Sequence, residues 1–393
     1  MKAMEIKPSI YKIGAVDWDR RLFDSLVPLP DGTSYNAYLI YGSEKTVLID
    51  SVDPDKSDIL INQLKDTAKI DYIISHHTEQ DHSGSIPLVM QKYPDAKVIA
   101  SDKGKGMLAD HLLIPEDKII VVKDGETINL GNKTLEFVYT PWVHWPETMS
   151  TYLREDNILF TCDFFGSHLA TSDLFVTDEG RVYEAAKRYF AEIMMPFRSV
   201  IQKNMEKLRG YKIDIIAPSH GPLYDKPAFI IDAYTDWVFG PPKNVAVIPY
   251  VSMHGSTKVM VEYLVSVLAE KGVKVEQYDI TATDIGKLAI SLVDAATVVI
   301  GTPTFQVGPH PAAVYVAHLA NLLRPKVKFV SVVGSFGWSS SVVEKISGLI
   351  PNLKAELIDP VICKGYPKSD TYQALDIMAQ TISNKHREMN LTN

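Results

Sequence analysis

The chain changes its pattern of strands and helices at residues 239–244, which read Phe-Gly-Pro-Pro-Lys-Asn. A Gly-Pro-Pro run does not continue a helix or a strand, because proline fixes φ and lacks a backbone N–H. Before this break, hairpins and helices follow one another irregularly, whereas after it strands and helices alternate regularly. A length of 393 residues suits two domains. We therefore predict one domain over residues 1–240 and a second over residues 244–393.

The second part of the chain has the pattern of a parallel sheet with helices on both faces. Runs of strand character fall at residues 245–250, 273–278, 297–300, 327–333 and 353–358, and helical runs at 257–271, 311–323, 342–349 and 371–385. Helices that connect successive strands in this way are crossovers between parallel strands. We expect an α/β fold here, a doubly wound parallel sheet with the strand order 2-1-3-4-5.

The first part of the chain contains more strands, and some of them are joined by short turns. Strands are predicted at residues 35–41, 46–50, 72–74, 97–100, 134–140, 150–153, 158–162 and 213–217, with helices near 59–64 and 86–92. Each part can bury a sizeable core, since hydrophobic residues make up 46% of the chain and charged residues only 22%.

The composition argues against several classes of function. A net charge of −8 is not that of a nucleic-acid-binding protein. No apolar run reaches the roughly 18 residues that a membrane span needs, and the first residues lack an apolar signal core. We therefore expect a cytoplasmic protein that does not bind a membrane. The two cysteines, Cys162 and Cys363, are too few for a disulfide scaffold or a four-cysteine iron site.

A concentration of metal-binding side chains closely follows the predicted strand at residues 72–74. The segment reads His-Thr-Glu-Gln-Asp-His, so His77, Glu79, Asp81 and His82 can all bind a metal. The pattern is H-x-E-x-D-H, whereas two-zinc hydrolases have H-x-H-x-D-H. The exchange of an imidazole for a carboxylate at Glu79 favours iron over zinc, and redox chemistry over hydrolysis.

Three further candidate ligands each follow a predicted strand of the same part. They are His144 in Pro-Trp-Val-His-Trp-Pro, Asp163 directly after Phe-Thr-Cys, and His220 in Ala-Pro-Ser-His-Gly-Pro. Seven ligands are too many for one ion and suit two, and Asp163 is the natural bridge because a carboxylate has two oxygens. The oxygen-rich mixture suits iron or manganese. We interpret His168 and Tyr189 as candidate catalytic residues, one lining the pocket and the other supplying a hydroxyl beside the ligands.

Three loops of the second part have the composition of an FMN site. Each follows a predicted strand, and their candidate residues are Ser252, Met253, His254, Gly255, Ser256 and Thr257, then Pro303, Thr304, Phe305 and Gln306, then Ser335, Phe336, Gly337 and Trp338. Hydroxyls and backbone N–H groups at a helix start bind phosphate, and Gly255 permits a tight turn there. The carboxyl ends of the strands beside the switch point are where such sheets bind FMN.

With these motifs in place, the chain resembles the flavodiiron proteins, also called A-type flavoproteins, over nearly its whole length. The resemblance implies a metallo-β-lactamase-like αββα sandwich followed by a flavodoxin-like domain. It also implies a di-iron centre with a complete set of ligands: His77, Glu79 and His144 for one iron, Asp81, His82 and His220 for the other, and Asp163 as the bridge. In some members, water displaces the histidine that matches His82. Many members have a histidine where this chain has Asp24, so the resemblance implies no role for that position.

The resemblance further implies a reductase of small gases. An external donor, such as rubredoxin or a reductase, supplies electrons through FMN to the irons, and dioxygen is reduced to water, nitric oxide to nitrous oxide, or both. Members form a head-to-tail homodimer or a dimer of dimers, in which the flavin of one subunit serves the metals of another. Two alternatives stay open: a two-zinc metallo-β-lactamase-like hydrolase fused to a flavodoxin, and an electron carrier whose metal half is structural. The residues do not indicate which gas is preferred.

Overall fold

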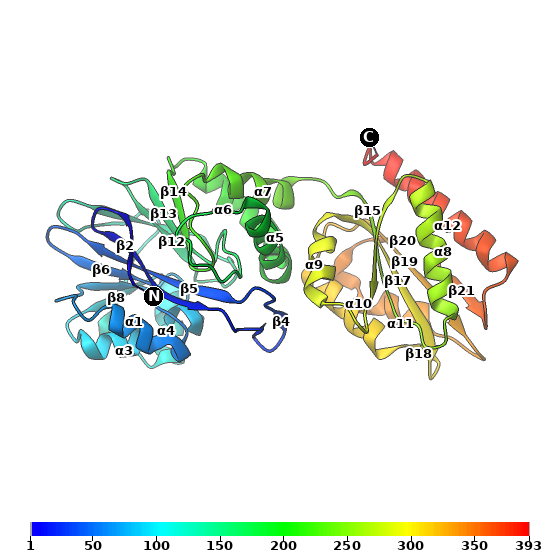
Figure 1. Cartoon of the computed structure of the whole chain (residues 1–393), viewed down its shortest axis with the longest axis horizontal. Coiled ribbons are helices and arrows are strands. Elements are labelled where there is room, and N and C mark those ends of the chain that lie inside the picture. Colours follow the sequence, from blue (N-terminus) through cyan, green and yellow to red (C-terminus); the bar gives the residue numbers. More distant parts are fainter. Residues whose placement is uncertain (1, 393) are drawn as a thin grey trace. The chain divides into compact units, whose positions relative to one another are not determined.

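The computed structural model describes residues 2–392, which form two compact units (Figure 1). The first unit contains the residues up to Tyr189 together with Phe197–Phe239. The second contains Phe190–Pro196 and the residues from Gly240 onward, so the principal division of the chain falls at the Gly-Pro-Pro run. In the described part of the chain, no helix is long and apolar enough to cross a membrane.

The first unit is built on two sheets. One has the strand order β1-β2-β5-β6-β7-β8-β9, and its strands are β1 (Met4–Lys7), β2 (Ile10–Asp17), β5 (Thr33–Tyr41), β6 (Thr46–Ile49), β7 (Tyr72–Ile74), β8 (Lys97–Ala100) and β9 (Ile119–Val121). The other has the order β10-β11-β12-β13-β14, with β10 (Thr127–Asn129), β11 (Thr134–Tyr139), β12 (Met149–Leu153), β13 (Ile158–Cys162) and β14 (Ile215–Pro218). A separate short hairpin pairs β3 (Leu22–Phe23) with β4 (Val27–Pro28).

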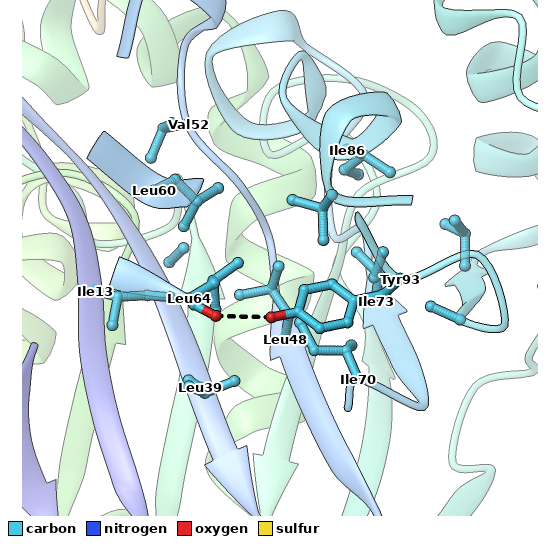
Figure 2. Close-up of a cluster of buried hydrophobic side chains, with 14 of the residues drawn as sticks. Ile13, Leu39, Leu48, Val52, Leu60, Leu64, Ile70, Ile73, Ile86 and Tyr93 are labelled. Atoms are coloured by element: carbon cyan, nitrogen blue, oxygen red, sulfur yellow. Dashed lines mark hydrogen bonds between the residues drawn. The ribbon is translucent and has the colours of Figure 1, made fainter. Parts of the chain in front are cut away.

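Alternating side chains of the first sheet supply two apolar cores. In β7, Ile73 belongs to the core under the helices and Ile74 to the core between the sheets, where Phe137 and Phe160 meet it from the second sheet. This alternation follows from the period of a strand, in which successive side chains point to opposite faces. Figure 2 shows the core under the helices, where the Tyr93 hydroxyl donates to a backbone carbonyl oxygen at 2.8 Å.

Helices cover both outer faces of the two sheets. The helices of the first unit are α1 (Ser57–Gln63), α2 (Gln80–Ser83), α3 (Ile86–Lys92), α4 (Asp102–Leu112), α5 (Glu179–Tyr189), α6 (Arg198–Leu208) and α7 (Ala228–Phe239). Residues of α1, α3 and α4 pack on the first sheet, and Figure 1 shows α6 and α7 beside the second. The unit is a metallo-β-lactamase-like αββα sandwich, which confirms this part of the predicted fold class.

The second unit is a flavodoxin-like parallel sheet with helices on both faces. Its strand order is β16-β15-β17-β19-β20, which in chain order is the predicted 2-1-3-4-5, and this prediction is confirmed. The elements are β15 (Lys243–Tyr250), α8 (Ser256–Glu270), β16 (Lys274–Asp279), α9 (Ile285–Asp294), β17 (Ala295–Phe305), β18 (Gly308–Pro309), α10 (Pro311–Leu323), β19 (Phe329–Phe336), α11 (Val342–Leu349), β20 (Glu356–Leu357), β21 (Val361–Lys364) and α12 (Ser369–Glu388). Helices α8 and α12 pack together on one face of this sheet.

The fifth strand of the second unit differs from the sequence expectation. One strand was expected over residues 353–358, but the structure has two short strands, β20 and β21, each paired in parallel with a different part of β19. Pro351 begins a 3₁₀ turn that includes Leu353, and Pro360 lies between the two strands. Proline cannot donate a ladder hydrogen bond, so the edge of the sheet is interrupted at these points.

Candidate metal centre and flavin pocket

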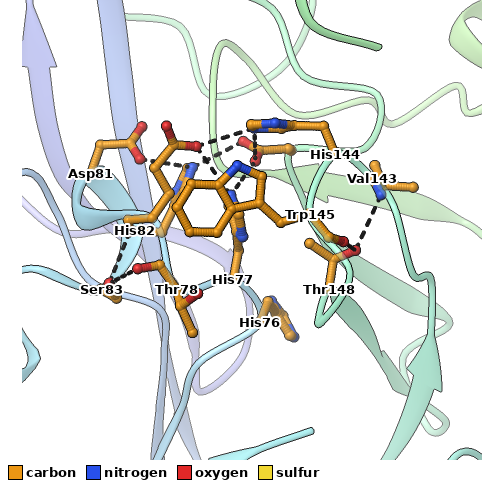
Figure 3. Close-up of polar contacts among 12 residues, drawn as sticks. His76, His77, Thr78, Asp81, His82, Ser83, Val143, His144, Trp145 and Thr148 are labelled. Atoms are coloured by element: carbon orange, nitrogen blue, oxygen red, sulfur yellow. Dashed lines mark hydrogen bonds and ion pairs between the residues drawn. The ribbon is translucent and has the colours of Figure 1, made fainter. Parts of the chain in front are cut away.

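Four loops of the first unit bring the candidate metal ligands together. His77 and Glu79 lie after β7, and the short helix α2 carries the next two ligands of the motif. The other three loops follow β11, β13 and β14 and carry His144, Asp163 and His220. All seven predicted ligands meet in two groups. Figure 3 shows several of them converging from different segments, although the segments are far apart in the sequence.

The first group consists of the Nε2 atoms of His77 and His144 and one oxygen each of Glu79 and Asp163. Glu79 Oε2 lies 3.1 Å from both nitrogens, and Asp163 Oδ2 lies 3.5 Å from both. Atoms that bind one ion at about 2.0–2.2 Å lie roughly 3 Å from each other. The four atoms therefore have the spacing of ligands around a single metal ion.

The second group contains His82, His220, Asp81 and the other oxygen of Asp163. Asp163 Oδ1 lies 2.9 Å from His82 Nε2 and 3.3 Å from His220 Nε2. The oxygens of Asp81 lie 3.3 Å and 3.2 Å from the same two nitrogens. Asp163 thus offers Oδ2 to the first group and Oδ1 to the second, which is the arrangement of a carboxylate that bridges two ions.

The polar atoms of the second group fit metal ions better than they fit each other. Both oxygens of Asp81, both oxygens of Asp163 and both ring nitrogens of His82 are buried without a well-aligned hydrogen bond among the described residues. The 2.9 Å between His82 and Asp163 is an ion-pair distance that lacks hydrogen-bond alignment. Buried polar atoms without partners are rare because they are costly. Cations among these lone pairs would remove that cost, so the residues fit a pair of metals.

Without metal, the charges of the site are balanced by protons on the histidines. Burial lowers the pKa of His220, but the Asp163 and Asp81 carboxylates that face its Nε2 outweigh burial and raise this pKa to about 10. The same opposition raises the pKa of His144 to about 9. Burial raises the pKa of Asp163, but the facing histidines hold it well below its ordinary value. A metal must therefore displace protons from the imidazoles, so its affinity falls as the pH falls.

The two candidate catalytic residues, His168 and Tyr189, pack against His220. Their ring centroids lie 4.8 Å and 5.7 Å from that of His220. Burial, and then the charge of the Asp163 carboxylate, raise the pKa of Tyr189 well above its ordinary value. Burial, and then the charge of His220, hold the pKa of His168 well below its ordinary value. Both side chains therefore border the site as neutral hydrogen-bonding groups, and His168 Nδ1 lies 2.9 Å from Thr33 Oγ1.

Two carboxylates beside the site were missed by sequence reasoning. Asp50 accepts from the His76 amide at 2.8 Å and lies 2.8 Å from its Nδ1, while Thr151 lies 2.7 Å from its Nε2. Both ring nitrogens of His76 are thus occupied, and Figure 3 shows this residue pointing away from the ligands. Glu147 accepts from His77 Nδ1 at 2.7 Å. Neither acid belongs to a motif, and the position of Glu147 in the loop of another ligand is the only available signal.

The first group of ligands is the more accessible of the two. The side chains of Glu79 and His144 are 13% and 16% exposed, whereas that of Asp81 is 3% exposed. Asp24, for which the resemblance implied no role, lies within electrostatic reach of this side of the site. Burial, and then the carboxylates of Glu79 and Asp81, raise the pKa of Asp24.

The second unit contains a pocket of about 440 Å³ at the carboxyl ends of its central strands. The predicted residues that line it are Ser252, Met253, His254, Ser256, Thr257, Pro303, Thr304, Phe305, Gln306, Ser335, Phe336, Gly337 and Trp338. Gly255 does not line the pocket but is the N-cap residue that precedes helix α8, with φ at +89°. Gly365, which follows β21, also lines the pocket and was not predicted from the sequence.

The pocket suits a flat ring that carries a phosphate. Ser252 Oγ accepts from the amides of Gly255 and Lys258, both at 3.2 Å, and holds the loop in shape. Gly255 provides no side chain to cap α8, and the start of a helix favours an anion. The side chains of Trp338 and Phe305 are 79% and 40% exposed, so two aromatic rings flank the pocket without being part of the core.

Replacement of Trp338 by alanine is expected to weaken flavin binding roughly 10-fold, because stacking of one aromatic ring on a base contributes about 1–3 kcal/mol. Titration of flavin-free protein with FMN, followed by flavin fluorescence, measures the effect. The matched control is Tyr315→Ala on α10, an aromatic of the same unit that is 45% exposed and does not line the pocket. Equal FMN affinity in the two variants would show that Trp338 does not contact the ring.

Comparisons with known proteins agree with this architecture. Residues 33–221 match the ODP family beta lactamase and residues 248–375 match flavodoxin. The chain is 35% identical to a nitric oxide reductase of Moorella thermoacetica, over 90% of each chain. Its structure matches rubredoxin oxygen:oxidoreductase from Desulfovibrio gigas with a TM-score of 0.95 and 29% identity, over 98% of this chain and 99% of that one. It matches the flavodiiron protein from Giardia intestinalis with a TM-score of 0.90 and 26% identity, over 98% of each.

The chain belongs to the flavodiiron protein family, whose members are oxidoreductases. Membership implies a flavin in the second unit and a metal centre in the first.

Proposed function

We propose that this protein reduces dioxygen to water, nitric oxide to nitrous oxide, or both, with electrons that an external donor passes through FMN to a di-iron centre. The observation that carries the proposal is the position of Glu79. Its Oε2 lies 3.1 Å from both His77 and His144, so an oxygen ligand completes the group that an imidazole would complete in a two-zinc hydrolase. The names of the relatives, a nitric oxide reductase and a rubredoxin oxygen:oxidoreductase, support the same reaction class.

The proposal assigns each bound group to residues of this chain. His77, Glu79 and His144 would hold one iron, Asp81, His82 and His220 the other, and Asp163 both; the loops of the 440 Å³ pocket would hold FMN. FMN can accept electrons singly or in pairs, and iron supplies a redox-active ion with positions open to a gas. The gas would reach the first group past the partly exposed Glu79 and His144.

Tyr189 and His168 would act on the second group in this proposal. The charge of the bridging Asp163 carboxylate raises the pKa of the Tyr189 hydroxyl, which would stay protonated and could donate a hydrogen bond beside the metals. His168 is held neutral by burial and packs against both Tyr189 and His220, with ring centroids 4.8 Å from each. Both residues are uncharged, so both could donate hydrogen bonds near the metals without repelling them.

We also propose a rubredoxin or a reductase as the electron donor, and a head-to-tail homodimer or a dimer of dimers as the working assembly. The name of the Desulfovibrio gigas protein supports a donor of the rubredoxin type. An obligate assembly loses turnover when dilution separates its subunits. Turnover per chain that stays constant down to concentrations at which the chain sediments as a monomer would contradict the dimeric assembly.

Metal analysis and gas consumption together test the function. We expect two irons and one FMN per chain, and rapid consumption of at least one gas when the photoreduced protein meets dioxygen or nitric oxide in separate electrode chambers. Unreduced protein serves as the control in each chamber. Two zincs per chain, hydrolysis of esters or thioesters and no consumption of either gas would instead establish the hydrolase.

A further inference from the structure

Glu147 is a buried carboxylate that contacts the metal centre but belongs to neither group of ligands. Its side chain is 1% exposed, and it lies in the loop between β11 and β12. Its Oε1 lies 2.7 Å from His77 Nδ1, 3.0 Å from the Thr78 amide nitrogen and 2.8 Å from Thr78 Oγ1. A single oxygen thus collects three hydrogen bonds from two consecutive residues of the metal-binding motif.

These contacts determine which nitrogen of His77 carries a proton. The Thr78 amide can only donate, so Glu147 Oε1 is an acceptor and His77 Nδ1 must be the donor. Nε2 is therefore the nitrogen of His77 that is left to bind a metal, and it faces Glu79 Oε2 at 3.1 Å and Asp163 Oδ2 at 3.5 Å. A proton or a metal ion between Nε2 and these oxygens removes the repulsion between the nitrogen lone pair and the two carboxylates, and a metal takes the place of the proton when it binds.

Two other histidines of the site, His220 and His82, have weaker hydrogen-bond partners at Nδ1 or none. His220 Nδ1 lies 2.7 Å from the backbone carbonyl oxygen of Ser34, a neutral acceptor. His82 Nδ1 is buried and has no hydrogen-bond partner within residues 2–392. A carboxylate partner raises the basicity of an imidazole more than a carbonyl does, and it fixes the ring orientation. The difference makes His77 the most strongly oriented of these three histidines.

The backbone of Glu147 also connects this residue to a second metal ligand, His144. Glu147 follows His144 by three residues in one loop, and its carbonyl oxygen accepts from Ser101 Oγ at 2.7 Å. The loop that carries His144 is therefore fastened at Glu147 to the start of α4 through the backbone, and to the loop of His77 through the side chain. Glu147 is thus connected to both histidines of the first group, to His77 by a hydrogen bond and to His144 along the chain, and in the described part of the chain its hydrogen bonds reach only His77, Thr78 and Ser101.

We propose that Glu147 is a positioning residue for one of the two metal ions: its carboxylate holds His77 with Nε2 directed at that ion, and its place in the loop aligns His144 with it. The proposal rests on the proposed function only in requiring that the site binds metal. It makes the first metal position, and not the second, dependent on Glu147.

The test compares metal retention in Glu147→Gln and wild-type protein. Glutamine keeps the shape of the side chain but removes its charge and adds an N–H₂ group that cannot accept from His77. We expect one of the two irons to bind about 10- to 100-fold more weakly, the usual cost of losing the partner of a ligating histidine. Iron remaining per chain after dialysis against graded chelator concentrations gives the affinity, and Mössbauer spectra show whether one or both iron sites change.

Glu136→Gln is the matched control, because Glu136 is a mostly buried glutamate on β11 that bonds Arg154 and Tyr211 and no ligand. A second variant, Thr78→Val, removes one donor to Glu147 and should weaken the same iron by a smaller factor, which keeps the test decisive if Glu147→Gln does not fold. Retention equal to that of Glu136→Gln in both variants, or equal loss of both irons, would overturn the inference. A wild-type protein that binds no metal would instead overturn the proposed function.

Discussion

Replacement of Asp163 by asparagine is expected to lower gas consumption at least about 100-fold and to lower the iron content from two ions per chain to one or none. Asp163 is 1% exposed and offers one oxygen to each group of ligands, at 3.5 Å from the nitrogens of the first and 2.9–3.3 Å from those of the second. An asparagine amide keeps one weak oxygen ligand and turns an N–H₂ group toward the other ion. Because loss of a mere partner of a ligand costs about 10- to 100-fold, loss of the shared ligand should cost at least about 100-fold in turnover.

Asp71→Asn provides the matched control for this variant. Asp71 has a side chain that is 8% exposed, pairs with Lys69 at 2.5 Å and lies at the opposite end of β7 from the metal-binding loop. Iron content by mass spectrometry and gas traces after photoreduction are compared in both variants. Two irons and wild-type consumption rates in Asp163→Asn would show that Asp163 is not the bridge, and the division of the site into two groups would need to be redrawn.

Much of the site could be predicted from the sequence, because its metal ligands lie where predicted strands end. Residues 72–74, an apolar run followed by a cluster of ligands, form β7 with those same bounds, and the cluster lies where the strand ends. Ligands in the loops after other strands of the two sheets lie close to this cluster, because the loops that follow these strands lie at the same edge of the sheets. In the second unit the same reasoning led to the order 2-1-3-4-5, since each helix returns the chain to start another parallel strand.

Contacts across long sequence separations could not be predicted in this way. Glu147 lies 70 residues from His77, and nothing in either local pattern indicates that their side chains meet. Helix α9 was also missed, although it packs on β15, because its start follows a loop of small polar residues. The division of the sheet edge into the two short strands β20 and β21 depends on where prolines lie relative to the neighbouring strand β19. Periodicity describes one element at a time, whereas these features are set by tertiary packing.

Replacement of Glu79 by histidine is expected to change the metal that the protein binds in cells from iron to zinc and to lower gas consumption at least about 100-fold. The variant has the H-x-H-x-D-H pattern of two-zinc hydrolases. Among the described residues, Glu79 Oε2 is the oxygen that lies 3.1 Å from both His77 and His144, and its loss leaves Asp163 as the oxygen ligand of the first group. Three imidazoles favour zinc, which has no redox chemistry, so electrons from the flavin could no longer reach a gas there.

Two measurements separate the choice of metal from the geometry of the site. Metal content of the purified Glu79→His protein gives the zinc-to-iron ratio, with Glu116→His, an exposed glutamate paired with Lys105, as the matched control. Anaerobic exchange of zinc for iron then tests whether activity returns. Substantial recovery would assign the loss to metal selection, whereas no recovery would assign it to the missing carboxylate oxygen. Retention of two irons and of wild-type gas consumption without any exchange would remove Glu79 as the residue that distinguishes this reductase from the hydrolases of the same fold.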